Sequence, residues 1–536
     1  MKVRTAFTTA YLTAGVIAIA ACGSTSGQSG HSPSDYAQDG TFTAVVNTDP
    51  GNLHPLLTSL IATQSVNAYT NDSLLSIDPK TREVGDYLAE TWTDAGSSLT
   101  FTLKKDVTCQ DGTSFNAQTA ADNLNWIADP KNSSPWLGVS VPPSTVATVD
   151  GDVLTVTTAE PTPFLLQRIG GIRLVCKAAL DDPSSIRNSS NGTGLFQITD
   201  VVANDHVTLE RRAGYHWGPN GDTTSDTLGV PKTVTVKVVT DPATTANLVL
   251  TGSVNAAAIL GPDQERVEAG GLDSMDYTNM TGEIIFNHNP ALPTADTTVR
   301  SALLQAIDLD DYTGINTGGK GSRATALAVN EPTACDYDSV TGTLPSFDMT
   351  AAKKSLNEAG WRTGPDGTLT KDSKPLTLNV VFNSSRDTFA AAAEYALAQW
   401  QELGAKVELR GGDNNFVISN TYAATDPTAW TISIGLAIQS NIPSLFARYF
   451  DGPQPPEGVN FAGIDNPKYS ELAAKASTMP GQESCPVWEE AERSLFTASD
   501  VAPVSISPNY MYFNGATSLY APAGGILTGP GVRVLK

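Results

Sequence analysis

Apolar and polar residues alternate with a period of two in several short segments of the chain. Leu99, Phe101 and Leu103 lie on one face of the first such segment. The alternation recurs in two later segments, at Val234, Val236 and Val238, and at Leu376, Leu378, Val380 and Phe382. A period of two is typical of β-strands with one buried face, so these segments predict strands.

Other segments follow the period of an α-helix. The spacing i, i+3, i+4, i+7, i+8 is met by Val299, Ala302, Leu303, Ala306 and Ile307. A second helix is expected from about Ala351 to Gly360, because glycine is favoured just past a helix C-terminus. A third shares one apolar face among Phe389, Ala393, Ala396, Leu397, Trp400 and Leu403. Strands and helices follow one another in both halves of the chain, which predicts an α/β fold.

The first 21 residues have the pattern of a signal peptide. Lys2 and Arg4 precede an apolar run over residues 10–21, which is too short to cross a bilayer. Small residues end the run directly before Cys22, and this arrangement resembles the lipobox of bacterial lipoproteins. The alternative is an ordinary signal peptide with an incidental Cys22. We expect residues 1–21 to be removed, Cys22 to be acylated, and residues 22–35 to form a flexible tether.

Composition narrows the class of protein. The 536 residues include 33 basic and 56 acidic side chains, for a net charge of −23. An excess of acid argues against nucleic acid as a partner, because phosphate is bound mainly by basic side chains. The length exceeds what one hydrophobic core needs, so at least two lobes are expected. No proline-rich or charged linker follows residue 35, so we expect lobes that share the chain.

Four cysteines remain after Cys22, namely Cys109, Cys176, Cys335 and Cys485. An even number in an exported chain favours disulfides, and four cysteines allow three connectivities. They form no pattern of metal-ligand spacing with histidine.

Catalytic motifs are missing from the sequence. The five histidines lie outside any HExxH pattern, and the chain has neither a GxSxG motif nor a P-loop. Residues 318–322 are rich in glycine, but their spacing fits a surface turn better than a phosphate-binding loop. We therefore expect a binding protein without cofactor or metal, and not an enzyme.

Several short motifs occur in an order that resembles one family. They are Leu88-Ala89-Glu90-Thr91-Trp92, the segment Phe101–Gly112, Gly192-Thr193-Gly194-Leu195-Phe196, Tyr215-His216-Trp217, Val299-Arg300-Ser301-Ala302 and Glu358-Ala359-Gly360-Trp361. Together they resemble the extracytoplasmic solute-binding proteins of the dipeptide, oligopeptide and nickel type, solute-binding family 5, which serve ABC importers. The resemblance covers the chain from about Phe42 to Val532.

The resemblance implies a two-lobed fold of the type II periplasmic-binding-protein kind, with the chain crossing twice between lobes. Lobe I would comprise residues 36–280 and 505–536, and lobe II residues 281–504. With these lobes, the pairs Cys109–Cys176 and Cys335–Cys485 each stay within one lobe, and a disulfide between lobes would impede hinge closure. The protein would be a monomer, lipid-anchored on the outer face of the plasma membrane, with a small solute and ABC permease subunits as partners.

One segment departs from the peptide-binding members of the family. These carry an aromatic residue and an aspartate where residues 434–446 have Leu436 and Gln439. The aspartate neutralises the α-ammonium of the peptide, and a neutral amide cannot do so. The departure favours a ligand that presents a neutral group here, such as a modified peptide or an oligosaccharide. A carboxylate from another loop, for instance Asp49 or Asp413, would weaken this conclusion.

Candidate ligand-binding residues lie in four places. Apart from the 434–446 segment, they are the loop after the first strand, a tryptophan, and the start of lobe II. The candidates are Asn52, His54, Trp136, Asn287, His288, Leu436, Gln439 and Asn441. For each, a turn or core position is the competing interpretation.

Two other functions remain open. The first is binding of a metal chelate of the nickel type, with His54 and His288 as ligands from opposite lobes. The second is a sensor lipoprotein that kept the fold without transport; a transporter operon beside the gene would argue against it.

Overall fold

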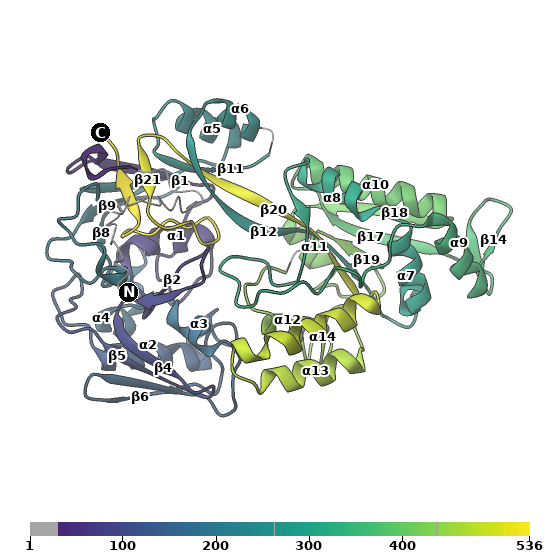
Figure 1. The fold of residues 1–536 in the computed structure, drawn as a ribbon, viewed down its shortest axis with the longest axis horizontal. Helices are drawn as coiled ribbons and strands as arrows, with labels where there is room; N and C mark the ends of the chain where they lie inside the picture. Colours follow the sequence, from purple (N-terminus) through teal and green to yellow (C-terminus); the bar gives the residue numbers. More distant parts are fainter. Residues whose placement is uncertain (1–30, 262, 436–437) are drawn as a thin grey trace, which may run out of the picture.

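The computed structural model of the protein describes residues 31–261, 263–435 and 438–536. Its largest sheet has 11 strands in the order β18-β17-β19-β12-β20-β11-β1-β10-β9-β8, with β13 beside β20. The sheet ends at β9 (His206–Arg211) and β8 (Phe196–Val202), and β13 is the short strand Ser322–Arg323. The two longest strands, β12 (Asp273–Phe286) and β20 (Val501–Phe513), pair antiparallel in the middle of this order. Figure 1 shows them running together from one lobe to the other. The predicted α/β fold with two crossings between lobes is confirmed.

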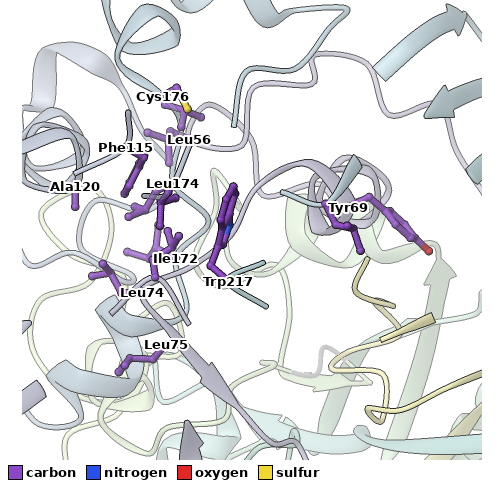
Figure 2. Packing of buried hydrophobic residues seen from close by; sticks show 14 of the residues in the cluster. Leu56, Tyr69, Leu74, Leu75, Phe115, Ala120, Ile172, Leu174, Cys176 and Trp217 are labelled. Carbon is purple, nitrogen blue, oxygen red and sulfur yellow. The ribbon is translucent and has the colours of Figure 1, made fainter. Parts of the chain in front are cut away.

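The first lobe is built around the largest hydrophobic cluster, whose residues come from 42–256 and 511–534. In the large sheet, β1 (Thr41–Val46) lies parallel to β10 (Thr233–Val238) and β11 (Ala256–Ile259). A separate sheet has the strand order β4 (Ala89–Asp94), β5 (Ser98–Leu103), β7 (Val153–Thr157) and β6 (Val146–Asp150). The alternation in β5 buries Leu99, Phe101 and Leu103, as the sequence predicts. Figure 2 shows part of this cluster, including Leu74, Ile172 and Leu174.

The second lobe contains two clusters formed mainly by residues 284–504. Its strands β17 (Thr377–Asn383), β18 (Lys406–Gly412) and β19 (Ile432–Ile434) are parallel and continue the large sheet beyond β12. The apolar stripe predicted from Val299 to Ile307 is buried. Its helix, α7 (Thr297–Gln305), begins where the Asp296 side chain accepts a hydrogen bond from the Thr298 N–H.

The predicted third helix is α10 (Asp387–Leu403). It buries Ala393, Ala396 and Trp400. It ends at Gly404, whose φ of 104° is the left-handed conformation that favours glycine at this position.

Each lobe contains one disulfide. Cys109 is bonded to Cys176 in the first lobe, and Cys335 to Cys485 in the second, which is the connectivity expected from the sequence. The second bond ties the loop before Cys335 to the start of α14 (Cys485–Thr497). Gln482 reinforces this attachment, because its Nε2 donates to the Ala334 carbonyl at 2.6 Å.

The proposed lobe boundaries, 36–280 with 505–536 and 281–504, fall within β12 and β20. The β12–β20 register is irregular from Met280 to Glu283, beside the first boundary. Within the described residues, none of the helices combines the length and apolar character needed to cross a membrane. The predicted signal peptide, Cys22 and most of the tether lie outside the described residues.

Candidate functional site

A cavity of about 960 Å³ lies between the two lobes. The first lobe contributes β2 (Leu75–Ile77), β3 (Val84–Asp86), the end of α3 (Leu165–Gly170) and residues between Tyr520 and Thr528. The second lobe contributes Pro332 and residues 439–442 with Leu445. Its volume falls in the range of pockets that bind small organic molecules.

Three of the predicted site residues line this cavity: Trp136, Gln439 and Asn441. The indole Nε1 of Trp136 donates to the Pro55 carbonyl at 2.8 Å, which fixes the ring in the wall of the first lobe. The Gln439 Nε2 donates to the Met280 carbonyl at 2.8 Å, and the Asn441 Nδ2 donates to the Pro332 carbonyl at 3.1 Å. The segment 439–441 is therefore held on the second lobe's side of the cavity.

Asn52 and His54 do not line the cavity. The Asn52 Oδ1 accepts a hydrogen bond from the His54 N–H at 3.1 Å, so this side chain closes a turn. The His54 side chain is buried against Trp126, with the two ring centroids 5.8 Å apart, and its Nδ1 accepts from the Leu56 N–H at 3.2 Å. Burial lowers the pKa of His54 to about 4. The loop turns into the core of the first lobe, and only its next residue, Pro55, reaches the cavity.

Asn287 and His288 also lie away from the cavity. The Asn287 Nδ2 donates to the carbonyls of Pro427 and Trp430, at 2.7 and 2.8 Å. The His288 Nε2 lies 3.8 Å from an Asp500 carboxylate oxygen, which is itself paired with Arg300 at 2.7 Å. Burial and the Arg300 charge lower the pKa of His288 to about 3. Both residues therefore belong to the interior of the second lobe.

These positions correct the predicted histidine pair for a nickel site, since His54 and His288 are each buried within a separate lobe. In the parts of the chain that the structure describes, no group of three or more His, Cys, Asp or Glu could hold a metal ion. Leu436 lies outside the described residues. Asp49 and Asp413 do not line the cavity either. Asp413 caps α11 (Asn414–Asn420) by accepting from the Phe416 N–H at 2.9 Å.

Sequence reasoning missed several residues of the cavity wall, among them Tyr87, Arg168 and Arg173. The Tyr87 hydroxyl donates to Asp72, a buried carboxylate that also accepts from Thr193 and Trp217 at 2.9 and 3.0 Å. A buried network of this kind fixes the wall behind the cavity. In the sequence, Arg173 stands out as a basic residue within the otherwise apolar segment 172–175, which could have marked it as a candidate.

The backbone of residues 70–72 shapes this wall as well. Gly192 and Gly194 lie against Thr70, and a Cβ at either position would come within 2.3 Å of its backbone. The glycines of the Gly192–Phe196 motif therefore permit a close approach of two chain segments. The packing explains why this motif contains glycine and places it behind the cavity.

Ion pairs and one apolar contact join the lobes beside the cavity. Lys80, in the β2–β3 turn, pairs with Asp276 of β12 and Glu331 of the second lobe, at 2.9 and 2.7 Å. Arg82 in the same turn pairs with Asp336 at 3.1 Å. Phe164, which precedes α3, is buried in a hydrophobic cluster of the second lobe. The lobes are thus joined by these side-chain contacts as well as by the two crossing strands.

Comparison with known proteins agrees with this geometry. The profile of the bacterial extracellular solute-binding proteins, family 5, matches residues 83–454. The glutathione-binding protein GsiB of Salmonella choleraesuis is 25% identical over 455 residues, which cover 83% of this chain and 84% of GsiB.

Two solved structures share the fold. The substrate-binding protein CtaP of Listeria monocytogenes superposes with a TM-score of 0.78 at 20% identity, covering 93% of this chain and 100% of that one. NikA of Brucella suis, in complex with Fe(III)-EDTA, gives 0.75 at 20% identity, covering 92% and 100%. The sequence profile, the shared fold and the cavity between lobes lead to one conclusion: the chain belongs to family 5 of the bacterial extracellular solute-binding proteins, which serve ABC importers.

Proposed function

We propose that the protein is the lipid-anchored substrate-binding subunit of an ABC importer and captures a peptide-like organic solute. The observation that carries this proposal is the cavity of about 960 Å³, whose walls come from both lobes. Closure of two lobes around a solute buries it on all sides and removes it from water.

The lining is mixed in character, which suits an organic solute with several polar groups. Leu75, Ile77 and Ile442 offer apolar contact. Ser76, Ser140 and Asn441 offer donors and acceptors. GsiB, which this chain resembles, binds glutathione, a small modified peptide. Gln439 favours a peptide whose α-amine is blocked, since its side chain cannot neutralise an α-ammonium.

A metal chelate is the second candidate. NikA, which shares the fold, was crystallised with Fe(III)-EDTA. The cavity offers arginines that suit the carboxylates of a chelate. Such a chelate would bring its own metal ligands, because His54 and His288 lie outside the cavity.

The lipid anchor is a separate part of the proposal and is tested separately. Acylation of Cys22 would tether the chain through residues 23–30, which are rich in glycine and serine. The Cys22→Ser variant should appear in the soluble fraction or remain unprocessed. Wild-type protein that is soluble with an unmodified N-terminus would contradict the anchor but not the binding function.

Calorimetric titration with three groups of compounds tests the choice of solute. The groups are N-acetylated tripeptides, peptides with a free α-amine (unmodified tripeptides and glutathione), and EDTA complexes of Ni²⁺ and Fe³⁺. We expect the first group to bind at least ten times more tightly than the second. Tight binding of the chelates alone would favour the second candidate, and the absence of binding by all three groups would contradict a peptide-like solute.

A further inference from the structure

Arg173 lies in the wall of the cavity. It is part of an extended segment in which its neighbours Ile172 and Leu174 are buried in the core of the first lobe, as Figure 2 shows. Side chains alternate in direction along such a segment, so Arg173 faces the opposite way, into the cavity that it lines. Among the described residues, its guanidinium group forms neither a hydrogen bond nor an ion pair.

Arg168, which lies in α3, lines the same cavity. Its guanidinium donates to two backbone carbonyls, Val139 at 3.1 Å and Gly138 at 3.3 Å, and these bonds hold it in place without neutralising its charge. Burial, and secondly the positive charge of Arg448, lowers the pKa of Arg168 to about 10. Arg448 belongs to α12 (Ser444–Phe450) of the second lobe. The positive charge of Arg448, from the second lobe, therefore acts on Arg168 in the cavity wall.

Elsewhere the contact between lobes joins opposite charges. Lys80 pairs with Glu331, Arg82 with Asp336, and Lys320 with Glu268. The chain also has 56 acidic residues for 33 basic ones, so an arginine without an acidic partner is unexpected. Within the described part of the chain, none of Arg168, Arg173 and Arg448 forms an ion pair with a carboxylate.

The acidic residues near the cavity do not fill this role. Asp78 and Glu83 line the cavity near the β2–β3 turn. The Asp78 Oδ1 accepts from the backbone N–H groups of Lys80 and Thr81 at 2.9 and 2.7 Å, so it closes the turn. Asp72, behind the wall, is enclosed by its three donors and acts on Arg173 only through its field. Burial of a cation without a partner costs free energy, which a bound anion would recover.

We infer that Arg173 and Arg168 form an anion-binding subsite on the first lobe and that the natural solute presents a carboxylate to it. Arginine offers a planar set of donors that matches a carboxylate in two parallel hydrogen bonds. The inference rests on the proposed function and adds the chemistry of one end of the solute: a carboxylate toward the first lobe, and a neutral group toward Gln439 of the second lobe.

Matched probes test this inference. N-acetylated tripeptides with a free carboxylate are compared with the same peptides as C-terminal amides, and citrate serves as a compact carboxylate probe. Each is titrated into the wild type, Arg173→Gln and Arg187→Gln. Arg187 is an exposed arginine of the same lobe outside the cavity, so its variant controls for the lost charge. Thermal unfolding of each variant without ligand checks that the fold is retained.

We expect the acids to bind the wild type about tenfold to a hundredfold more tightly than the amides. Arg173→Gln should lose this preference, and Arg187→Gln should keep it. Equal binding of acids and amides to the wild type, or full binding of the acids by Arg173→Gln, would overturn the subsite while leaving solute capture intact. If no peptide binds, thermal unfolding with citrate tests the subsite. Citrate that stabilises the wild type but not Arg173→Gln supports the subsite and contradicts only the peptide-like solute. Citrate that does not stabilise the wild type, or that stabilises both proteins equally, overturns the subsite.

Discussion

Lys80 of the first lobe and Glu331 of the second lobe form an ion pair, with 2.7 Å between Nζ and Oε2. Lys80 lies in the turn between β2 and β3, and Glu331 lies directly before Pro332, which lines the cavity. With the Arg82–Asp336 pair, this contact joins the lobes beside the cavity, in addition to the two strands on which they would hinge.

We therefore predict that the closed arrangement depends on charge. In the double variant Lys80→Met, Arg82→Met the ligand-free protein should be more open, with a larger radius of gyration in small-angle X-ray scattering. Each pair is partly exposed and contributes about 0.2–1 kcal/mol, so high salt should have a similar effect on the wild type. Lys177→Met removes the Lys177–Asp181 pair within the first lobe and serves as the control. An unchanged scattering curve in the double variant would contradict the role of these pairs.

The Cys335–Cys485 disulfide should affect binding as well as stability. The loop that it anchors holds the 439–441 segment, because Ala334 N–H donates to the Asn441 carbonyl at 2.7 Å and Asn330 N–H to the Ser440 carbonyl at 3.3 Å. Substitution of both cysteines by serine should weaken solute binding. Without the bond, the unfolded chain gains conformational entropy. This gain destabilises the folded state by at most roughly 4–5 kcal/mol.

The Cys109–Cys176 bond provides the matched comparison. It closes a loop with a separation of 67 residues in the first lobe, against 150 for the other bond, and neither cysteine lines the cavity. Its removal should lower the unfolding temperature by a comparable amount with a smaller change in affinity. Equal losses of affinity in the two variants, measured where both are folded, would show that the second bond has no special role at the site.

Glu283 should make stability depend on pH. It is buried in β12, where one carboxyl oxygen accepts from the Ile438 N–H at 3.2 Å, and burial raises its pKa from 4.5 to about 8. The folded protein therefore keeps a proton that the unfolded chain loses as the pH rises from about 4.5 to 8. The free energy of unfolding contributed by this group falls across that window.

Glu283→Gln removes the ionisable group and should gain stability relative to the wild type as the pH rises. We expect a difference of up to about 4 kcal/mol between pH 5 and pH 8, measured by urea unfolding. Glu358→Gln, at an exposed position of α9 (Met349–Glu358), controls for the loss of a carboxylate. A difference that is constant with pH, or that shrinks as the pH rises, would contradict the assignment.

Gln439→Asp tests the neutral end of the proposed solute. The wild-type side chain lines the cavity and donates to the Met280 carbonyl. An aspartate there would restore a partner for an α-ammonium, so unmodified tripeptides should bind about ten times more tightly than they bind the wild type. N-acetylated peptides, which have no α-ammonium, should bind more weakly or unchanged. Calorimetry in which unmodified tripeptides gain nothing would show that residue 439 does not face the amino end of the ligand.

Much of the fold could be predicted from the sequence, because its signals are local or repeated. Leu99, Phe101 and Leu103 alternate with polar residues because one face of their strand is buried. The apolar stripe that starts at Val299 recurs at the helical period because one face of its helix packs against the core. The two crossings of the chain between the lobes were predicted from the family resemblance, which rests on the order of the short motifs. The end of α7 at Gln305, before Ala306 and Ile307, was not predicted, because an apolar period continues through a turn that stays buried.

The site was harder to predict, because the cavity is formed by segments that are far apart in the sequence. Gln439 and Asn441 were found by comparison with a family pattern. His54 and His288 have no sequence feature that separates a buried imidazole from one in a cleft, and each is held by neighbours in its own lobe. Arg173 was missed because its run of apolar neighbours predicts a core strand, and only the lobe contact shows which side it faces.

Native mass spectrometry of the chain purified from its producing cells tests capture of a solute in the interlobe cavity most directly. Gly171→Trp is the matched variant: Gly171 lines the cavity with a φ of −89°, and the nearest atom to an added Cβ is 3.8 Å away, so an indole can fill the space without strain in the backbone. Gly314→Trp, on the exposed side of α8 (Leu309–Thr317), is the control. We predict one small organic solute per chain in the wild type and in Gly314→Trp, and none in Gly171→Trp. A wild-type chain that carries no solute, or a Gly171→Trp chain that carries the same solute, would contradict this prediction.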